Sequence, residues 1–181
     1  MEMGQWQMTR FDDELSKEEC EVTLLVGDCK FYVKREPLTT HSTYFKCLFS
    51  TVSSESKNLE FELKDIDRSS FHFFLEVVHQ FPIMQPNAVI GVLHLADLYD
   101  SRFAIQKCEE HLFDNWTYSN KEKLIMASKY KMDELKKDCI SQLRTVAEIK
   151  AILPEDPEET KKFDSQLLID LDSKLIALME L

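Results

Sequence analysis

Two residues with metal-binding side chains, Cys108 and His111, stand three positions apart in a segment whose pattern predicts a helix. Residues at this spacing share one helical face, so a thiolate and an imidazole could reach the same metal ion. A structural zinc site needs four such ligands, usually from two spaced pairs, and the sequence has no second pair, because His41 and Cys47 are isolated. We therefore expect no metal site, and we expect Cys108 to be a buried apolar side chain.

No group of residues predicts catalysis. A serine or cysteine nucleophile needs a histidine base and an orienting acid, and no serine stands in a local motif such as G-x-S-x-G. Asp170 and Asp172 cannot act as a pair on a helix, because side chains two positions apart point in different directions. The glycines, Gly4, Gly27 and Gly91, are too scattered to form a phosphate-binding loop. We expect a protein that is not an enzyme and binds no cofactor.

The composition is that of an acidic globular protein. The 181 residues carry a formal net charge of −11, which repels nucleic acid and anionic membranes. No run approaches the roughly 18 apolar residues of a membrane-spanning helix, and the first residues lack the pattern of a signal peptide. The five scattered cysteines form no C-x-x-C pair and are expected to stay reduced. These features predict a cytoplasmic and/or nuclear location.

The expected elements begin with a β-hairpin. Apolar residues alternate along 22–26 and again along 31–33, and Gly27-Asp28 between them is typical of a turn. Pro37 can open the helix that follows, because a proline lacks the N–H that is unpaired at a helix start. Alternation returns along 59–63 and predicts a further strand.

From residue 67 onward the apolar pattern becomes helical. Asp67, Asn87, Ser101 and Asp133 precede apolar stripes and are candidate helix starts, while Ser119 and Glu122 form the S-x-x-E capping box. The acidic, proline-bounded segment 154–159 predicts a linker. The last helix places leucines at alternating spacings of three and four, which fits either a short coiled-coil seam or a helix packed on its own domain: Leu168, Leu171, Leu175 and Leu178. We divide the chain into a lead-in (1–19), a main domain (20–115), a helical extension (116–153) and an acidic linker with a C-terminal helix (154–181).

One spaced pattern resembles a known family. Leu38, Ser42, Tyr44, Phe45 and Phe49 match L-x-x-x-S-x-Y-F-x-x-x-F, which is typical of the BTB (POZ) domain, a protein-interaction module. The segments "LKDI", "HQFPI" and "LADLY" are similar to the BTB part of the nematode-type MATH–BTB family, without a MATH domain. The helices after residue 117 resemble the start of a BACK-like extension. The resemblance implies an α+β BTB fold, a small sheet flanked by a cluster of helices and followed by a short helical extension.

The resemblance also implies partners. It predicts a homodimer, with Leu38 and Tyr44 in the interface and with Glu21 paired to Arg35 nearby, although Glu21 replaces the usual aspartate. In the lead-in, Trp6, Met8 and Phe11 could either cover the domain's own surface or add to a partner subunit, and Trp6 or Phe11 could join the dimer contact.

The function implied is that of an adaptor for a cullin-3 RING ubiquitin ligase, which would bind the cullin and an unknown substrate protein. The predicted cullin-binding residues are Phe49, Val52, Glu55 and Tyr99. Val52 and Glu55 supply the hydrophobic and acidic residues of the family's motif, with one extra residue between them. The alternative is an oligomerisation scaffold, homomeric or heteromeric, without a link to a ligase.

Overall fold

The computed structural model describes residues 11, 17–18, 20–51, 59–81, 85 and 87–180. Its contacts divide the chain into two compact units, Met1–Ala104 and Ile105–Leu181. The division falls inside a helix and earlier than the boundary placed after residue 115, and the predicted domain limits stay a prediction.

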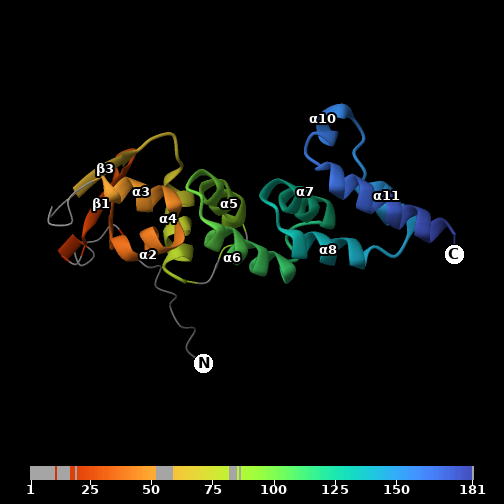
Figure 1. The fold of residues 1–181 in the computed structure, drawn as a ribbon, viewed down its shortest axis with the longest axis horizontal. Helices are drawn as coiled ribbons and strands as arrows, with labels where there is room; N and C mark the ends of the chain where they lie inside the picture. The colour runs from red at the N-terminus through yellow and green to blue at the C-terminus, as the bar shows by residue number, and fades with distance from the viewer. Residues whose placement is uncertain are drawn as a thin grey trace, which may run out of the picture. The chain divides into compact units, whose positions relative to one another are not determined.

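The first unit contains a three-stranded sheet, in which β1 and β3 are labelled in Figure 1. The strand order is β2-β1-β3. Strands β1 (Val22–Val26) and β2 (Cys29–Val33) form the predicted antiparallel hairpin, and Gly27 adopts the positive φ of 56° that its turn requires. Strand β3 (Leu59–Leu63) runs parallel to β1, so the chain between them must cross over. Every second residue of β1 is buried, so one face of this central strand packs on the core, as the alternation in the sequence predicts.

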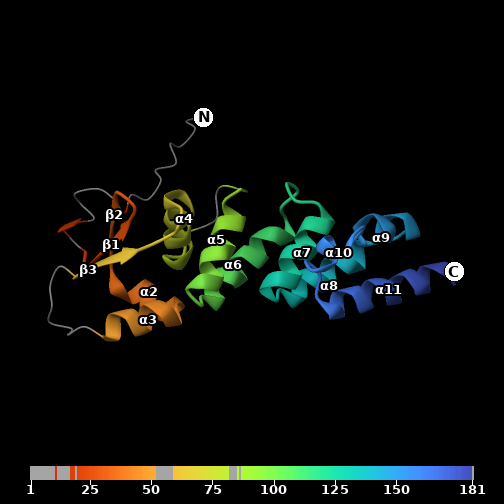
Figure 2. The same cartoon turned by 90° about the horizontal axis from the view of Figure 1, so that it is seen from above.

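The helices in the described part of this unit include α2 (Arg35–His41), α3 (Thr43–Ser50), α4 (Arg68–Val78) and α5 (Ala88–Leu98), which precede α6 (Arg102–Phe113). Asp67 caps α4 as predicted and accepts the N–H of Ser70, whereas Asn87 precedes α5 without a capping hydrogen bond from its side chain. Pro37 lies within the first turn of α2 rather than at its first position. The predicted α+β class, with a small sheet beside a helical cluster, is confirmed (Figure 2).

The close approach of α4 and α5 depends on Gly91. A Cβ atom added to this glycine would lie 2.3 Å from the Ser70 hydroxyl oxygen and 2.8 Å from the Ser70 Cβ. The missing side chain therefore allows the two helices to pack in contact. Beneath them the core is aromatic, and the rings of Phe31 and Phe71 meet edge to face with centroids 5.1 Å apart.

Helix α6 (Arg102–Phe113) crosses the division, and the second unit then continues as helices only. These are α7 (Asn120–Tyr130), α8 (Asp133–Gln142), α9 (Val146–Ile152), α10 (Pro157–Thr160) and α11 (Ser165–Met179). The capping box of Ser119 and Glu122 is present at the start of α7, as predicted. Asp133 differs from expectation, because the cap position of α8 is Met132 and Asp133 is the first helical residue.

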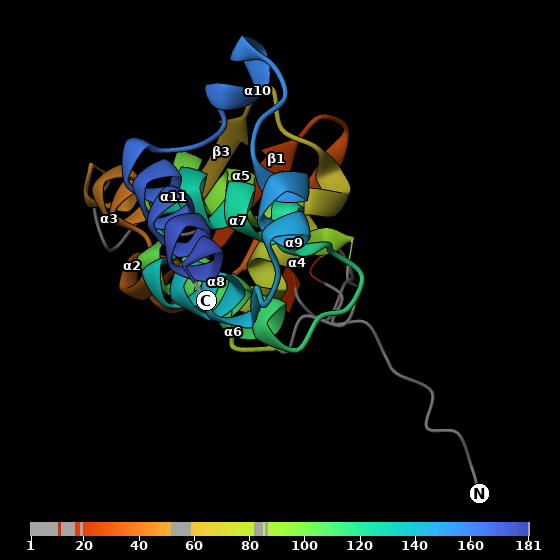
Figure 3. The ribbon, with the colours of Figure 1, turned by 90° about the vertical axis from the view of Figure 1, so that its right-hand side faces the viewer.

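The leucines of the last helix serve its own unit. Of the four leucines in the predicted pattern, Leu171 is completely buried, whereas Leu168, Leu175 and Leu178 are half-buried. Leu167, outside that pattern, is also completely buried, and α11 packs against α8 and α9 (Figure 3). This packing agrees with a helix on its own domain rather than with a free coiled-coil seam. Among the described helices, none is both long enough and apolar enough to span a lipid bilayer.

Candidate interaction surfaces

The start of α3 is tied firmly to the end of α5. Ser42 caps α3 by accepting the N–H of Phe45 at 3.2 Å, and its own hydroxyl donates to the carbonyl oxygen of Tyr99 at 2.6 Å. Next to it, the Thr43 hydroxyl donates to the carboxylate of Asp100, which adopts a positive φ of 48° just after α5. These bonds fix the orientation of the first turn of α3.

Tyr44 is the aromatic side chain that this turn presents. Tyr44 is 41% exposed. The centroid of its ring lies 5.0 Å from that of Tyr99 and 5.2 Å from that of Phe45. A half-exposed tyrosine on an immobilised backbone is the kind of side chain that carries binding energy at protein interfaces, because little entropy is lost when it docks. Tyr44 is therefore available for the interface role predicted for it.

Two of the predicted cullin-binding residues lie in the interior instead. Phe49 and Tyr99 are buried, and Tyr99 is surrounded by the rings of Phe45 and Phe74 at 4.8 and 5.6 Å. Burial, with a smaller effect from Tyr44, raises the pKa of Tyr99 far above its ordinary value, so its hydroxyl stays protonated. In this structure the two residues position their neighbours and offer no surface to a partner. The other two, Val52 and Glu55, lie outside the described residues.

The predicted dimer residues are also partly internal. Leu38 is completely buried within its own unit, so its side chain presents no surface for a second subunit here. Phe11 is buried between the rings of His72 and His79, at 5.6 and 4.9 Å, and its carbonyl accepts the N–H of Tyr32. Phe11 thus covers the unit's own surface in this structure. Trp6 and Met8 lie outside the described residues.

Glu21 and Arg35 do meet, although not as the predicted ion pair. A carboxylate oxygen of the exposed Glu21 accepts the backbone N–H of Arg35 at 2.8 Å, at the first turn of α2. The buried Nε of Arg35 has no hydrogen-bond partner in the described part of the chain. The contact therefore satisfies a free N–H at a helix start, and it does not pair two buried charges.

The outer face of α5 was missed by the sequence analysis. Ile90, His94 and Leu98, spaced four residues apart, are exposed on one side of this helix. The helix is apolar on nearly all sides, which is a signal of a helix with contacts on more than one face. The exposed apolar residues of α5 and Tyr44 belong to the same unit.

In the second unit, Trp116 is almost completely solvent-exposed, at 96%. The turn that carries it is ordered by the buried Asn115, whose side chain accepts the N–H of Thr117 at 2.8 Å and lies 2.9 Å from Nε2 of His111. His111 is thus engaged by Asn115, and burial raises the pKa of the Cys108 thiol to about 12. In the described ranges, no three His, Cys, Asp or Glu residues are placed to hold a metal ion.

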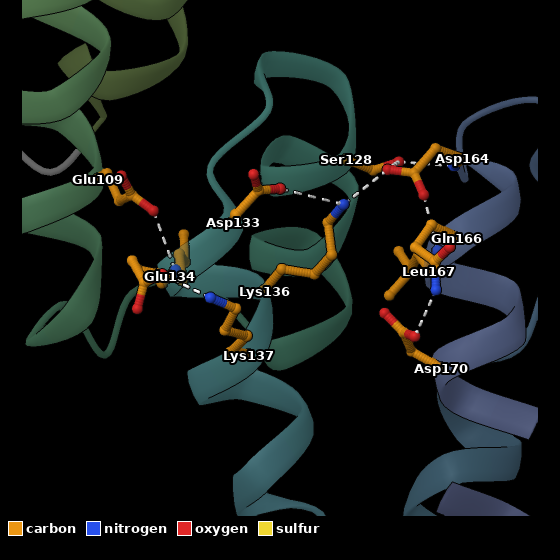
Figure 4. Close-up of polar contacts among 11 residues, drawn as sticks. Glu109, Ser128, Asp133, Glu134, Lys136, Lys137, Asp164, Gln166, Leu167 and Asp170 are labelled. Carbon is orange, nitrogen blue, oxygen red and sulfur yellow. Dashed lines mark hydrogen bonds and ion pairs between the residues drawn. The ribbon is translucent and has the colours of Figure 1, made fainter. Parts of the chain in front are cut away.

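A polar cluster joins three helices of the second unit (Figure 4). Asp164 caps α11 by accepting the N–H of Leu167 at 2.7 Å, and its other oxygen accepts from Nζ of the buried Lys136 at 2.8 Å and from the hydroxyl of Ser128 at 3.0 Å. Burial of the carboxyl opposes its ionisation, but these hydrogen bonds outweigh burial and hold the pKa of Asp164 below its ordinary value. The cluster fixes the start of α11 on α7 and α8.

Comparison with known proteins points to one family. The sequence profile of the BTB/POZ domain matches residues 11–115. BTB and MATH domain-containing protein 15 of Caenorhabditis elegans is 40% identical over 134 residues, which cover 74% of this chain and 49% of that protein. Protein 45 of the same series and organism is 39% identical over 141 residues, covering 78% and 30% of the two chains. The chain thus spans half or less of the length of these relatives.

Among solved structures, the BTB domain of zebrafish PATZ1 aligns with 55% of this chain and 83% of its own, at 23% identity and a TM-score of 0.42. The resemblance carried by the Leu38 to Phe49 pattern is confirmed by the profile match, which covers more than half of the sequence. The chain belongs to the BTB/POZ domain family, a family of protein-interaction modules.

Proposed function

We propose that this chain acts as a dimeric adaptor that brings partner or substrate proteins to a cullin-3 RING ubiquitin ligase, in the cytoplasm and/or the nucleus. Family membership and the likeness to BTB and MATH domain-containing proteins support a role in protein interaction. The cullin link rests on the sequence resemblance, and the dimer is the family's usual assembly.

The observation that carries the proposal is the presentation of Tyr44 by α3. The hydrogen bonds of Ser42 and Thr43 fix the start of the helix. The chain that leaves α3 leads to Val52 and Glu55, the hydrophobic and acidic residues of the predicted motif. Besides the dimer contact predicted for it, we assign Tyr44 to the cullin contact, because a fixed and exposed aromatic side chain fits an interface in which a few side chains dominate the affinity.

Calorimetry with the N-terminal domain of cullin-3 tests this proposal. We expect the wild type to bind with micromolar or tighter affinity, Val52→Asp to abolish binding, and Tyr44→Ala to weaken it by about tenfold or more, as truncation of a central aromatic residue does. Phe81→Ala is the matched control, because Phe81 is 43% exposed against 41% for Tyr44 and lies in the same unit. If the wild type does not bind, the adaptor proposal is wrong. If both aromatic variants weaken binding equally, the role assigned to Tyr44 is wrong.

The second candidate is an oligomerisation scaffold without a ligase. The extra residue between Val52 and Glu55 favours it, because a shifted acid would miss its position on the cullin. Light scattering at micromolar concentration separates the outcomes when it is combined with the calorimetry. A dimer that does not bind the cullin indicates the scaffold, and a monomeric mass at every concentration would contradict the dimer in both.

A further inference from the structure

Helix α11 exposes three large apolar side chains on the side that faces away from its own unit. Ile169, Ile176 and Met179 are 55%, 58% and 70% exposed. Their spacing of seven and three residues places them on one helical face, and the completely buried Leu167 and Leu171 lie on the opposite face. Isolated exposed apolar residues are common on protein surfaces, but a row along one helix face marks an interaction site.

This face cannot turn inward to bury its apolar side chains. Asp164 holds the first turn of α11 through its bonds to Lys136 and Ser128 (Figure 4), and the inner leucines are already packed against α8 and α9. Rotation of the helix would expose the buried leucines in exchange. The outer row is therefore a preformed surface, and its occupation by a partner needs no rearrangement of the helix.

The charges beside the row restrict what can cover it. Asp172 and Glu180 are both exposed on the outer side of α11, and the outward positions of this helix contain no lysine or arginine. Lys174 lies on the inner side and is half-buried. A second copy of this chain would bring a second set of carboxylates against the first, and the whole protein is already acidic at −11. The complementary partner has an apolar seam with basic flanks.

The length of the row indicates the form of the partner. Met179 follows Ile169 by ten positions, which corresponds to about 15 Å along a helix axis. Three anchors over this distance match the spacing of apolar residues on one face of an amphipathic helix. We propose that the outer face of α11 is a docking surface for a basic amphipathic helix of a partner protein, which packs its apolar seam on Ile169, Ile176 and Met179 and directs lysines or arginines to Asp172 and Glu180.

The surface is tested with defined peptides and the full chain. The probe is a fluorescein-labelled peptide of about 18 residues with leucines at helical spacing and lysines on both flanks, and its fluorescence anisotropy reports binding. One control peptide has the same composition with the leucine spacing scrambled, and a second keeps the leucines and replaces lysine by glutamate. We expect the basic amphipathic peptide to bind at least about tenfold more tightly than either control, and to bind more weakly as salt is raised.

Protein variants assign the binding to α11. Ile176→Ser should lower the peptide affinity by about tenfold, and Asp172→Lys should lower it and flatten the salt dependence. Ile90→Ser is the matched control, because Ile90 is 55% exposed on a helix of the other unit, and it should leave the affinity unchanged.

Three results would overturn the proposal. Equal affinity for the scrambled peptide would show charge attraction alone, and an unchanged affinity of Ile176→Ser would place the binding elsewhere. A concentration-dependent increase in mass that Ile176→Ser removes would assign the face to a second copy of the chain. Because the readout contains no cullin, failure of the adaptor function leaves this test unaffected.

Discussion

The substitution Asp164→Ala should destabilise the second unit by about 2–3 kcal/mol, because one carboxylate both caps α11 and neutralises a buried lysine. Loss of the cap on the Leu167 N–H costs about 1 kcal/mol. Loss of the partner of Lys136 would cost about 3–5 kcal/mol if both charges were fully buried. The Asp164 side chain is 36% exposed, and Asp133 remains 3.8 Å from the same Nζ, so we reduce this contribution to about 1–2 kcal/mol.

The variant Asp164→Asn separates the two contributions, because asparagine caps a helix about as well as aspartate but carries no charge. It should lose only the lysine contribution, about 1–2 kcal/mol, and Lys136→Met in the same chain should restore part of that loss by removing the stranded charge. Urea unfolding followed by circular dichroism gives the free energy of unfolding, and hydrogen exchange of the α11 amides shows whether the loss is local.

The same carboxylate predicts a pH dependence. The pKa of Asp164 is lower in the folded protein than in the unfolded chain, where it is about 3.9. Its stabilisation is therefore complete above that unfolded value and is lost as the pH falls through the folded value. Asp164→Asn should flatten this acid limb of the stability curve and leave the neutral range parallel to the wild type. Wild-type stability of Asp164→Asn, with an unchanged acid limb, would refute the role assigned to the charge.

Three further outcomes are expected. Gly91→Ala should destabilise the first unit by about 1–3 kcal/mol in urea unfolding, because its Cβ would overlap Ser70, and Ser70→Gly should rescue it; a neutral Gly91→Ala would contradict the helix contact. Glu21→Ala should lower the free energy of unfolding by about 1 kcal/mol, because it removes the acceptor of the Arg35 backbone N–H. Arg35→Ala keeps that N–H and should leave the bond intact, so an equal loss of stability in both variants would indicate a pair between the two side chains. The Cys108 thiol, with a pKa of about 12, should resist iodoacetamide in the folded protein and react after unfolding, as mass spectrometry can show; rapid native labelling would exclude its burial.

The features that the sequence analysis predicted well depend on residues close together in the chain. The hairpin of β1 and β2 follows from alternation, and the capping box of Ser119 and Glu122 joins residues three positions apart. A second box, formed by Thr145 and Glu148 at the start of α9, has the same spacing and went unrecognised. Local chemistry of this kind is readable because all of its partners lie within one helical turn.

The features that were missed depend on contacts distant in the sequence. Tyr99 is buried because rings from α3 and α4 surround it, and no neighbour of Tyr99 in the chain indicates this. Glu21 reaches α2 through a backbone N–H, which has no sequence signature. The exposure of Trp116 and Ile176 likewise depends on which helix faces are covered in the folded unit. An apolar residue type alone cannot distinguish a core position from a docking surface.

Sedimentation analysis of the chain mixed with the N-terminal domain of cullin-3 tests the central proposal most directly, because one mass reports both dimerisation and ligase binding. The account predicts a complex of two chains with two cullin domains, formed by the wild type and by Phe81→Ala and lost in Tyr44→Ala at the same micromolar concentration. Separate sedimentation of the wild-type chain and the cullin domain would contradict the adaptor function.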